Sequence, residues 1–188
     1  MSEAPRTEDP RRPDTRRAPS VVLVNTGDGK GKSTAAMGMV MRSVARGWKV
    51  AVVQFIKSGK WKVGEEKIGL QLGVAWDTGG DGFSWDSEDL DHSAELSRKT
   101  WEIGKHRIGA GRHRLVVLDE ITYPINWGWI DVEEVVEALT NRPSGVNVVV
   151  TGRDAPAPLI EIADTVTEMR PVKHAYDQGI RAIRGIDF

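Results

Sequence analysis

A glycine- and lysine-rich stretch between residues 26 and 34 carries the clearest chemistry in this sequence. It reads Thr-Gly-Asp-Gly-Lys-Gly-Lys-Ser-Thr, and it lies between the apolar run 21–24 and a segment with helical character. Glycines allow successive backbone N–H groups to converge on an anion without Cβ clashes, and a helix that begins there adds the positive end of its dipole. The stretch therefore predicts a phosphate-binding loop between a strand and a helix.

Two side chains of this loop have predicted roles of their own. Lys32 would reach the β- and γ-phosphates of a nucleotide, and the Ser33 hydroxyl would ligate a divalent cation. The usual pattern G-x-x-x-x-G-K-S has glycine where this chain has Thr26, so the loop is a variant. The alternative, a glycine-rich turn without a ligand, does not explain why lysines and hydroxyl residues gather at one helix start. The predicted nucleotide-binding residues are Gly27, Asp28, Gly29, Lys30, Gly31, Lys32, Ser33 and Thr34.

One residue of the loop is at odds with phosphate binding. The carboxylate of Asp28 should repel an anion in the same nest of amides. We expect Asp28 to point away from the nest and to bond backbone amides in the turn, as Asp often does.

A pair of carboxylates, Asp119 and Glu120, follows the apolar run 115–118. A divalent cation on a triphosphate needs an acidic anchor across the sheet, so Ser33, Asp119 and Glu120 are the predicted ligands of Mg²⁺ or Mn²⁺. In a hydrolase the second acid would orient or deprotonate water, so Glu120 also fits an ordinary ATPase. The alternative is that both acids only end a strand and cap a neighbour.

Strands and helices alternate along the chain and position these residues. Strands are expected at 21–24, 49–55, 74–76, 115–118, 146–150 and 165–169, and helices at about 32–46, 65–72, 87–110, 131–142 and 158–163. Residues 121–130, with Pro124 among aromatic residues, are expected to form a loop. The pattern predicts a three-layer α/β fold with a mainly parallel sheet, of the P-loop NTPase (RecA-like) class.

Composition limits the remaining possibilities. The chain has 188 residues, a net charge of −1 and no cysteine. We expect one domain over 20–188, preceded by a disordered tail at 1–19 that is rich in arginine and proline. The sequence has no excess of basic residues, so we expect no nucleic acid partner. It has no leader-like segment and no long apolar run, so we expect no membrane partner and a cytoplasmic location.

Six strings of the sequence together resemble the ATP:corrinoid adenosyltransferases of the cobalamin pathway. The likeness runs in order from about residue 20 to 188. The strings are 25–36 (NTGDGKGKSTAA), 52–57 (VVQFIK), 82–86 (GFSWD), 118–123 (LDEITY), 151–153 (TGR) and 170–177 (RPVKHAYD).

This resemblance implies a homodimeric enzyme that transfers the 5′-deoxyadenosyl group of ATP to the cobalt of a reduced corrinoid and releases triphosphate. It also implies an electron-donating reductase as partner. Phe83 and Trp85 match aromatics that press on the lower face of the corrin; the alternative is that they are core anchors. With Lys32 and Glu120, they complete the expected catalytic set. A RecA-like ATPase and a non-catalytic nucleotide or corrinoid sensor remain the competing hypotheses.

Overall fold

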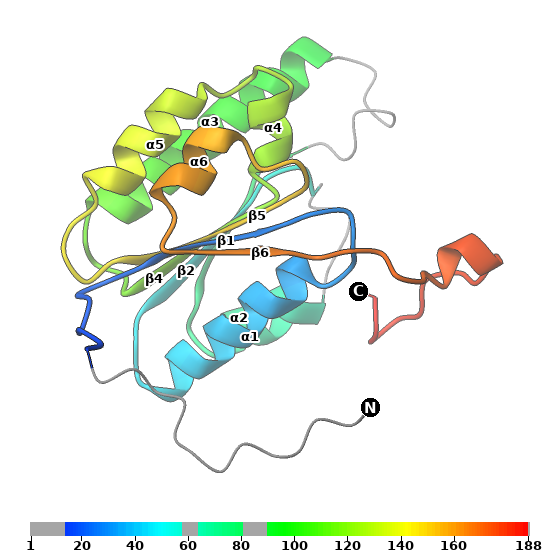
Figure 1. Ribbon diagram of the computed structural model, residues 1–188, viewed down its shortest axis with the longest axis horizontal. Coiled ribbons are helices and arrows are strands. Elements are labelled where there is room, and N and C mark those ends of the chain that lie inside the picture. The colour runs from blue at the N-terminus through cyan, green and yellow to red at the C-terminus, as the bar shows by residue number, and fades with distance from the viewer. Residues whose placement is uncertain (1–13, 58–63, 81–89, 188) are drawn as a thin grey trace.

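Apolar runs that are hydrophobic on both faces form the central strands of a parallel sheet, as their patterns predicted. The computed structural model describes residues 14–57, 64–80 and 90–187. Its strands are β1 (Val22–Thr26), β2 (Val50–Gln54), β3 (Ala75–Thr78), β4 (Leu115–Asp119), β5 (Asn147–Thr151) and β6 (Thr165–Glu168). They lie in the order β3-β2-β4-β5-β1-β6 (Figure 1), and all neighbouring strands run parallel.

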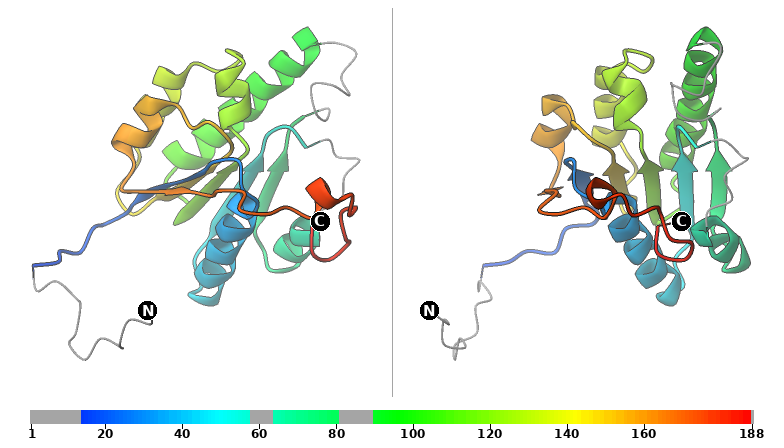
Figure 2. Two further views of the ribbon diagram at one scale, coloured as in Figure 1. Left: turned by 45° about the vertical axis from the view of Figure 1, so that its right-hand side comes forward. Right: turned by 90° about the vertical axis from the view of Figure 1, so that its right-hand side faces the viewer.

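Helices cover both faces of this sheet. One face carries α1 (Lys32–Ala45) and α2 (Gly64–Gln71), and the other carries α3 (Leu90–Gly109), α4 (Thr122–Asn126), α5 (Val132–Thr140) and α6 (Ala157–Ile162), as Figures 1 and 2 show. Each face encloses its own apolar cluster against the sheet. The three-layer α/β prediction, with its P-loop type of fold, is confirmed.

Capping residues fix the ends of two helices. Gly47 adopts the left-handed conformation (φ 71°) after α1, where the sequence predicted the helix to end. Asp131 caps α5, and its carboxylate accepts a hydrogen bond from the backbone N–H of Glu133 at 3.0 Å. Glu134, three residues after this cap, pairs with Lys105 of α3.

The prediction of a loop over 121–130 was wrong for its first half, where α4 forms. This helix is barely longer than one turn, so it has no periodic apolar stripe to reveal it, and its proline lies in the first turn, where proline is tolerated. The Thr122 hydroxyl donates to the Arg153 carbonyl at 2.6 Å, and the Asn126 amide donates to the Asp154 carbonyl at 3.0 Å. Contacts to the segment after β5, which are distant in sequence, therefore stabilise α4.

The chain end leaves the sheet after β6 and includes the short 3₁₀ helix η1 (Tyr176–Gln178). It lies beside the beginning of α1 (Figure 2), where Asp187 forms an ion pair with Lys30. Residues 14–19, within the predicted tail, are exposed and form no helix or strand. In the described part of the chain, no helix is long and apolar enough to cross a membrane.

Candidate active site

The loop that the sequence predicts to bind phosphate joins β1 to α1, so its expected place between a strand and a helix is confirmed. Gly31 occupies the N-cap of α1 with φ 116°, a conformation that favours glycine. Within the described structure, no side chain caps this helix. Its first-turn amides, which carry the positive end of the helix dipole, are therefore suited to receive an anion.

Two glycines of this loop are also required by a close contact with the backbone that follows β6. A Cβ on Gly27 would lie 2.5 Å from the Met169 carbonyl oxygen, and one on Gly29 would lie 2.7 Å from the same atom. Gly29 donates its N–H to that oxygen at 2.6 Å, and Met169 donates its N–H to Thr26 at 2.8 Å. The backbone just after β6 therefore packs directly against the loop. At Gly27 and Gly29 this contact leaves no space for a side chain.

Lys32 is folded onto the loop that precedes it. Its ammonium donates to the carbonyl oxygens of Gly27 at 2.6 Å and Gly29 at 2.8 Å. Burial lowers the pKa of Lys32, and the nearby charge of Arg153 lowers it further. These contacts place the Lys32 charge inside the curve of the loop.

Lys30 and Asp28 lie on the outer, exposed side of the same loop. Lys30 pairs with Asp187 near the chain end. The Asp28 carboxylate lies 3.7 Å from Arg153 Nε, so its observed charged partner is this arginine. The Arg153 charge therefore partly offsets the Asp28 charge beside the phosphate loop.

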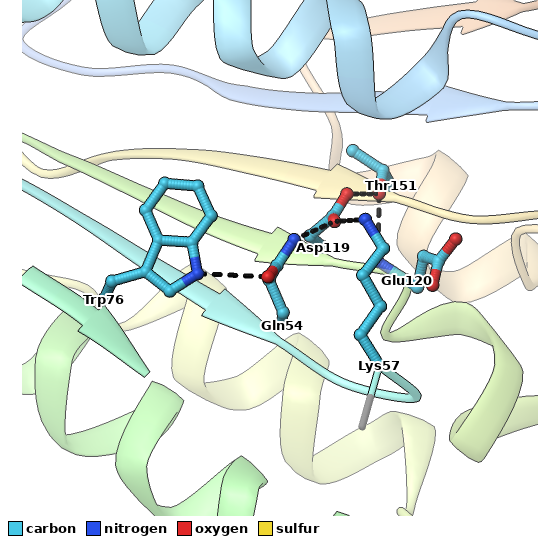
Figure 3. A network of polar contacts seen from close by, with 6 residues as sticks. All are labelled: Gln54, Lys57, Trp76, Asp119, Glu120 and Thr151. Carbon is cyan, nitrogen blue, oxygen red and sulfur yellow. Dashed lines mark hydrogen bonds and ion pairs between the residues drawn. The ribbon is translucent and has the colours of Figure 1, made fainter. Parts of the chain in front are cut away.

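Asp119 is the centre of a polar network at the carboxyl ends of β2, β4 and β5 (Figure 3). It is fully buried, at 0% exposure. Thr151 donates its hydroxyl to Asp119 Oδ1 at 2.8 Å, and Gln54 donates Nε2 to Oδ2 at 3.0 Å. The Lys57 ammonium lies 3.4 Å from the same Oδ2. Because Gln54 and Asp119 are register partners, neighbouring strands deliver these groups to one point.

Opposing effects set the ionisation of this network. Burial alone would raise the pKa of Asp119, but the Lys57 charge and hydrogen bonds from Ser33, Thr151 and Gln54 hold it below its usual value. Burial alone would also lower the pKa of Lys57, yet the charges of Asp119 and Glu120 raise it. Asp119 and Lys57 therefore form a charged pair inside the site.

Glu120 has a different environment from its neighbour. Its backbone lies in the left-handed region (φ 66°), and its N–H donates to the Thr151 hydroxyl at 2.9 Å. Its Oε2 is buried and has no hydrogen-bond partner among the residues that the structure describes. Burial, followed by the charge of Asp119, raises the pKa of Glu120 to about 7. A strained, buried and unsatisfied carboxyl is typical of a functional site.

The residues present fit a hard divalent cation. The Ser33 hydroxyl lies close enough to Asp119 to help lower the pKa of its carboxyl, which places a hydroxyl and a carboxylate together beside the loop that precedes α1. Oxygen ligands of this kind suit Mg²⁺ or Mn²⁺. Among the residues that the structure describes, no group of three or more His, Cys, Asp or Glu side chains is arranged to hold a metal ion.

The structure thus brings Lys32, Ser33, Asp119 and Glu120 to one edge of the sheet. Phe83 and Trp85 lie outside the described residues. At the level of the sequence, Gln54, Lys57 and Thr151 are identified only within strings of the family resemblance, and Trp76 and Met169 have no predicted role. A usable signal was present, because β2 and β5 are apolar strands that end in a polar residue, as β4 does.

Comparisons with known proteins agree with this site. Residues 19–188 match the family model "ATP:corrinoid adenosyltransferase BtuR/CobO/CobP". The corrinoid adenosyltransferase of Escherichia coli K12 is 42% identical over 168 residues, which cover 89% of this chain and 85% of that protein. The corrinoid adenosyltransferase CobA of Salmonella typhimurium LT2 is 40% identical with the same coverage. A Sinorhizobium corrinoid adenosyltransferase is 44% identical over 89% of this chain and 80% of its own length. This chain therefore belongs to the ATP:corrinoid adenosyltransferase family.

Proposed function

We propose that this protein transfers the 5′-deoxyadenosyl group of ATP to the cobalt of a reduced corrinoid, in cobalamin biosynthesis or salvage. Cobalt(I) of the substrate supplies an electron pair to the ribose C5′, a cobalt–carbon bond forms, and the bond from C5′ to the triphosphate oxygen breaks. The triphosphate leaves with that electron pair. Family membership over nearly the whole chain carries this proposal.

The charges of the site suit such a leaving group. Negative charge grows on the triphosphate as the bond to C5′ breaks, and the loop amides, Lys32 and the start of α1 would stabilise it. Ser33 and Asp119 would hold Mg²⁺ or Mn²⁺, which supplies further positive charge to the phosphates when bound. Because cobalt(I) is itself a strong nucleophile, the protein needs to position and shield the reactants rather than to activate a side chain.

Glu120 would serve as an acidic group beside the cation. Its pKa near 7 also suits a residue that takes a proton from water, which is the role it would have in an ATPase. The structural feature that favours this second function is the unpartnered Oε2 of Glu120. The two functions differ in their products.

Phe83 and Trp85 are proposed to cover the lower face of the corrin, so that no lower ligand reaches the cobalt and cobalt(II) can be reduced. This proposal rests on the string Gly82-Phe83-Ser84-Trp85. If both residues are changed to alanine, activity from cobalt(II) with a biological reductant should fall by orders of magnitude. The loss from chemically prepared cobalt(I) should be clearly smaller, and the melting temperature should be retained.

A homodimer and an electron-donating reductase complete the proposal. The free edge of β6, whose residues are all exposed, leaves room for a second chain at that side of the described sheet. Light scattering on the purified protein tests the dimer, and a monomer at micromolar concentration would exclude it.

The reaction products test the proposed function. Protein, ATP, Mg²⁺ and chemically reduced corrinoid are mixed in the dark, and the light-sensitive cobalt–carbon product is followed by absorbance while phosphorus NMR identifies the phosphates. Intact triphosphate should appear in step with the alkylated corrinoid. ADP and orthophosphate that form without corrinoid would establish the ATPase instead, and ATP binding without either product would indicate a sensor.

A further inference from the structure

Gln54 is a buried amide that is used at both of its ends. It is 2% exposed. The indole N–H of Trp76 donates to Gln54 Oε1 at 3.0 Å, while Gln54 Nε2 donates to Asp119 Oδ2 at 3.0 Å (Figure 3). An indole nitrogen can only donate, so it fixes which end of the amide is the oxygen. Trp76 therefore directs the Gln54 N–H groups toward Asp119.

This arrangement fixes the carboxylate of Asp119 from two sides. Thr151, on β5, holds Oδ1, and Gln54, on β2, holds Oδ2. These two strands flank β4, so the plane of the carboxylate is set by its two neighbours in the sheet. Oδ2 also accepts a hydrogen bond from the Lys57 ammonium at 3.4 Å, so Oδ1, which Thr151 holds, is the oxygen that keeps a second lone-pair direction for a further ligand.

We propose that Gln54, oriented by Trp76, is a positioning residue that holds Asp119 ready for the divalent cation of the nucleotide complex. This inference rests on the proposed function, since it takes Asp119 to be the acidic anchor of that cation. Groups that hydrogen-bond a metal ligand commonly tune metal affinity by about ten- to a hundredfold. Trp76 contacts Gln54 rather than Asp119, so its effect on metal affinity is smaller than that of Gln54.

Two variants test the hydrogen bond from Trp76 to Gln54 and the hydrogen bond from Gln54 to Asp119 separately. Trp76→Phe keeps an aromatic ring but removes the donor, so the Gln54 amide is free to rotate and present its oxygen to Asp119. Gln54→Met keeps the length and much of the shape of the side chain but removes both hydrogen bonds. Trp48→Phe is the matched control, because Trp48 packs on the same apolar cluster, and its ring stacks 4.7 Å from the Arg114 guanidinium.

The measurement is the affinity for ATP by calorimetry, once with saturating Mg²⁺ and once with EDTA. The ratio of the two dissociation constants gives the contribution of the cation without any turnover. We expect Gln54→Met to reduce this ratio about tenfold or more, and Trp76→Phe by about threefold, with affinity in EDTA unchanged. Trp48→Phe should retain the wild-type ratio.

Four outcomes would overturn the inference. An unchanged ratio in Gln54→Met would show that the amide only satisfies buried groups. Equal losses with Mg²⁺ and with EDTA would show a general disturbance of the pocket, which thermal melts of each variant would reveal independently. If Mg²⁺ does not improve ATP binding by the wild-type protein, the cation part of the proposed function fails and the inference fails with it. An intact Mg²⁺ effect that Asp119→Asn abolishes but Gln54→Met does not would overturn the inference alone.

Discussion

The backbone N–H of Gly29 donates to the carbonyl oxygen of Met169 at 2.6 Å, which ties the phosphate loop to the chain that follows β6. The contact is so close that a Cβ on Gly29 would lie 2.7 Å from the Met169 carbonyl carbon and oxygen. The shape of the loop thus depends on its own glycines and on a backbone contact with the segment that follows β6, the strand beside β1. Nucleotide affinity should respond to changes on either side of this contact.

Gly29→Ala should therefore weaken ATP binding by at least tenfold and lower the melting temperature by several degrees. The added methyl group meets backbone atoms, which cannot move aside as a flexible side chain would. Gly38→Ala, in α1, is the matched control, since a Cβ there meets nothing within 4 Å, and alanine is the better helix former by about 1 kcal/mol. Calorimetry and thermal melts check both variants. Normal ATP affinity in Gly29→Ala would contradict the steric argument.

Lys32→Ala should severely lower activity and ATP affinity while the fold stays intact. The Lys32 ammonium contacts only loop carbonyls among its observed hydrogen-bond partners, so its removal creates no cavity in the core. Loss of a charged donor to phosphate costs about 2 to 4 kcal/mol, which corresponds to a loss of about thirty- to a thousandfold in affinity or rate. Lys99→Ala, which removes an exposed ammonium on α3, should behave as the parent. Similar ATP affinity in the two variants would exclude Lys32 from the binding site.

Lys57→Met tests the charge balance of the site in the absence of nucleotide. Asp119 is fully buried, and Lys57 supplies a positive charge 3.4 Å from its Oδ2. We expect the variant to lose about 1 to 3 kcal/mol of unfolding free energy, less than for a fully enclosed pair because the Lys57 side chain is 25% exposed. Lys105→Met, which breaks the solvent-exposed pair with Glu134, should lose less unfolding free energy than Lys57→Met. Urea unfolding curves for both variants give the comparison, and equal losses would show that the Lys57 pair is not special.

Much of this architecture could be predicted from the sequence because its signals are local. Apolar runs and caps located the strands and most helices, and the loop sequence located Lys32 and Ser33. The contact between Gly29 and Met169 could not be predicted, since it joins residues that are distant along the chain. The same holds for Trp76, which looked like an ordinary strand residue until the sheet order placed β3 beside β2. Short α4 was missed because its stabilising partners, the carbonyls after β5, are also distant.

The buried carboxyl of Glu120 should make stability depend on pH. Its pKa is raised to about 7 in the folded protein, from an ordinary value of 4.5. The folded state therefore binds the proton more tightly than the unfolded state. This contribution to stability is complete below about pH 4.5 and is lost as the pH rises through about 7. A shift of this size corresponds to about 3 kcal/mol at most.

Glu120→Gln removes this titration and keeps the size of the side chain. The free energy of unfolding of the parent, relative to that of the variant, should fall by about 1 to 3 kcal/mol between pH 5 and pH 8. His113, whose pKa burial lowers, acts in the opposite direction in part of this range, but it is common to both proteins and cancels in the difference. The lowered pKa of Asp119 matters only below its ordinary value of 3.8, outside this window. Urea unfolding at several pH values measures the difference, and a flat difference across the range would show that Glu120 is already ionised at pH 5 in the folded protein.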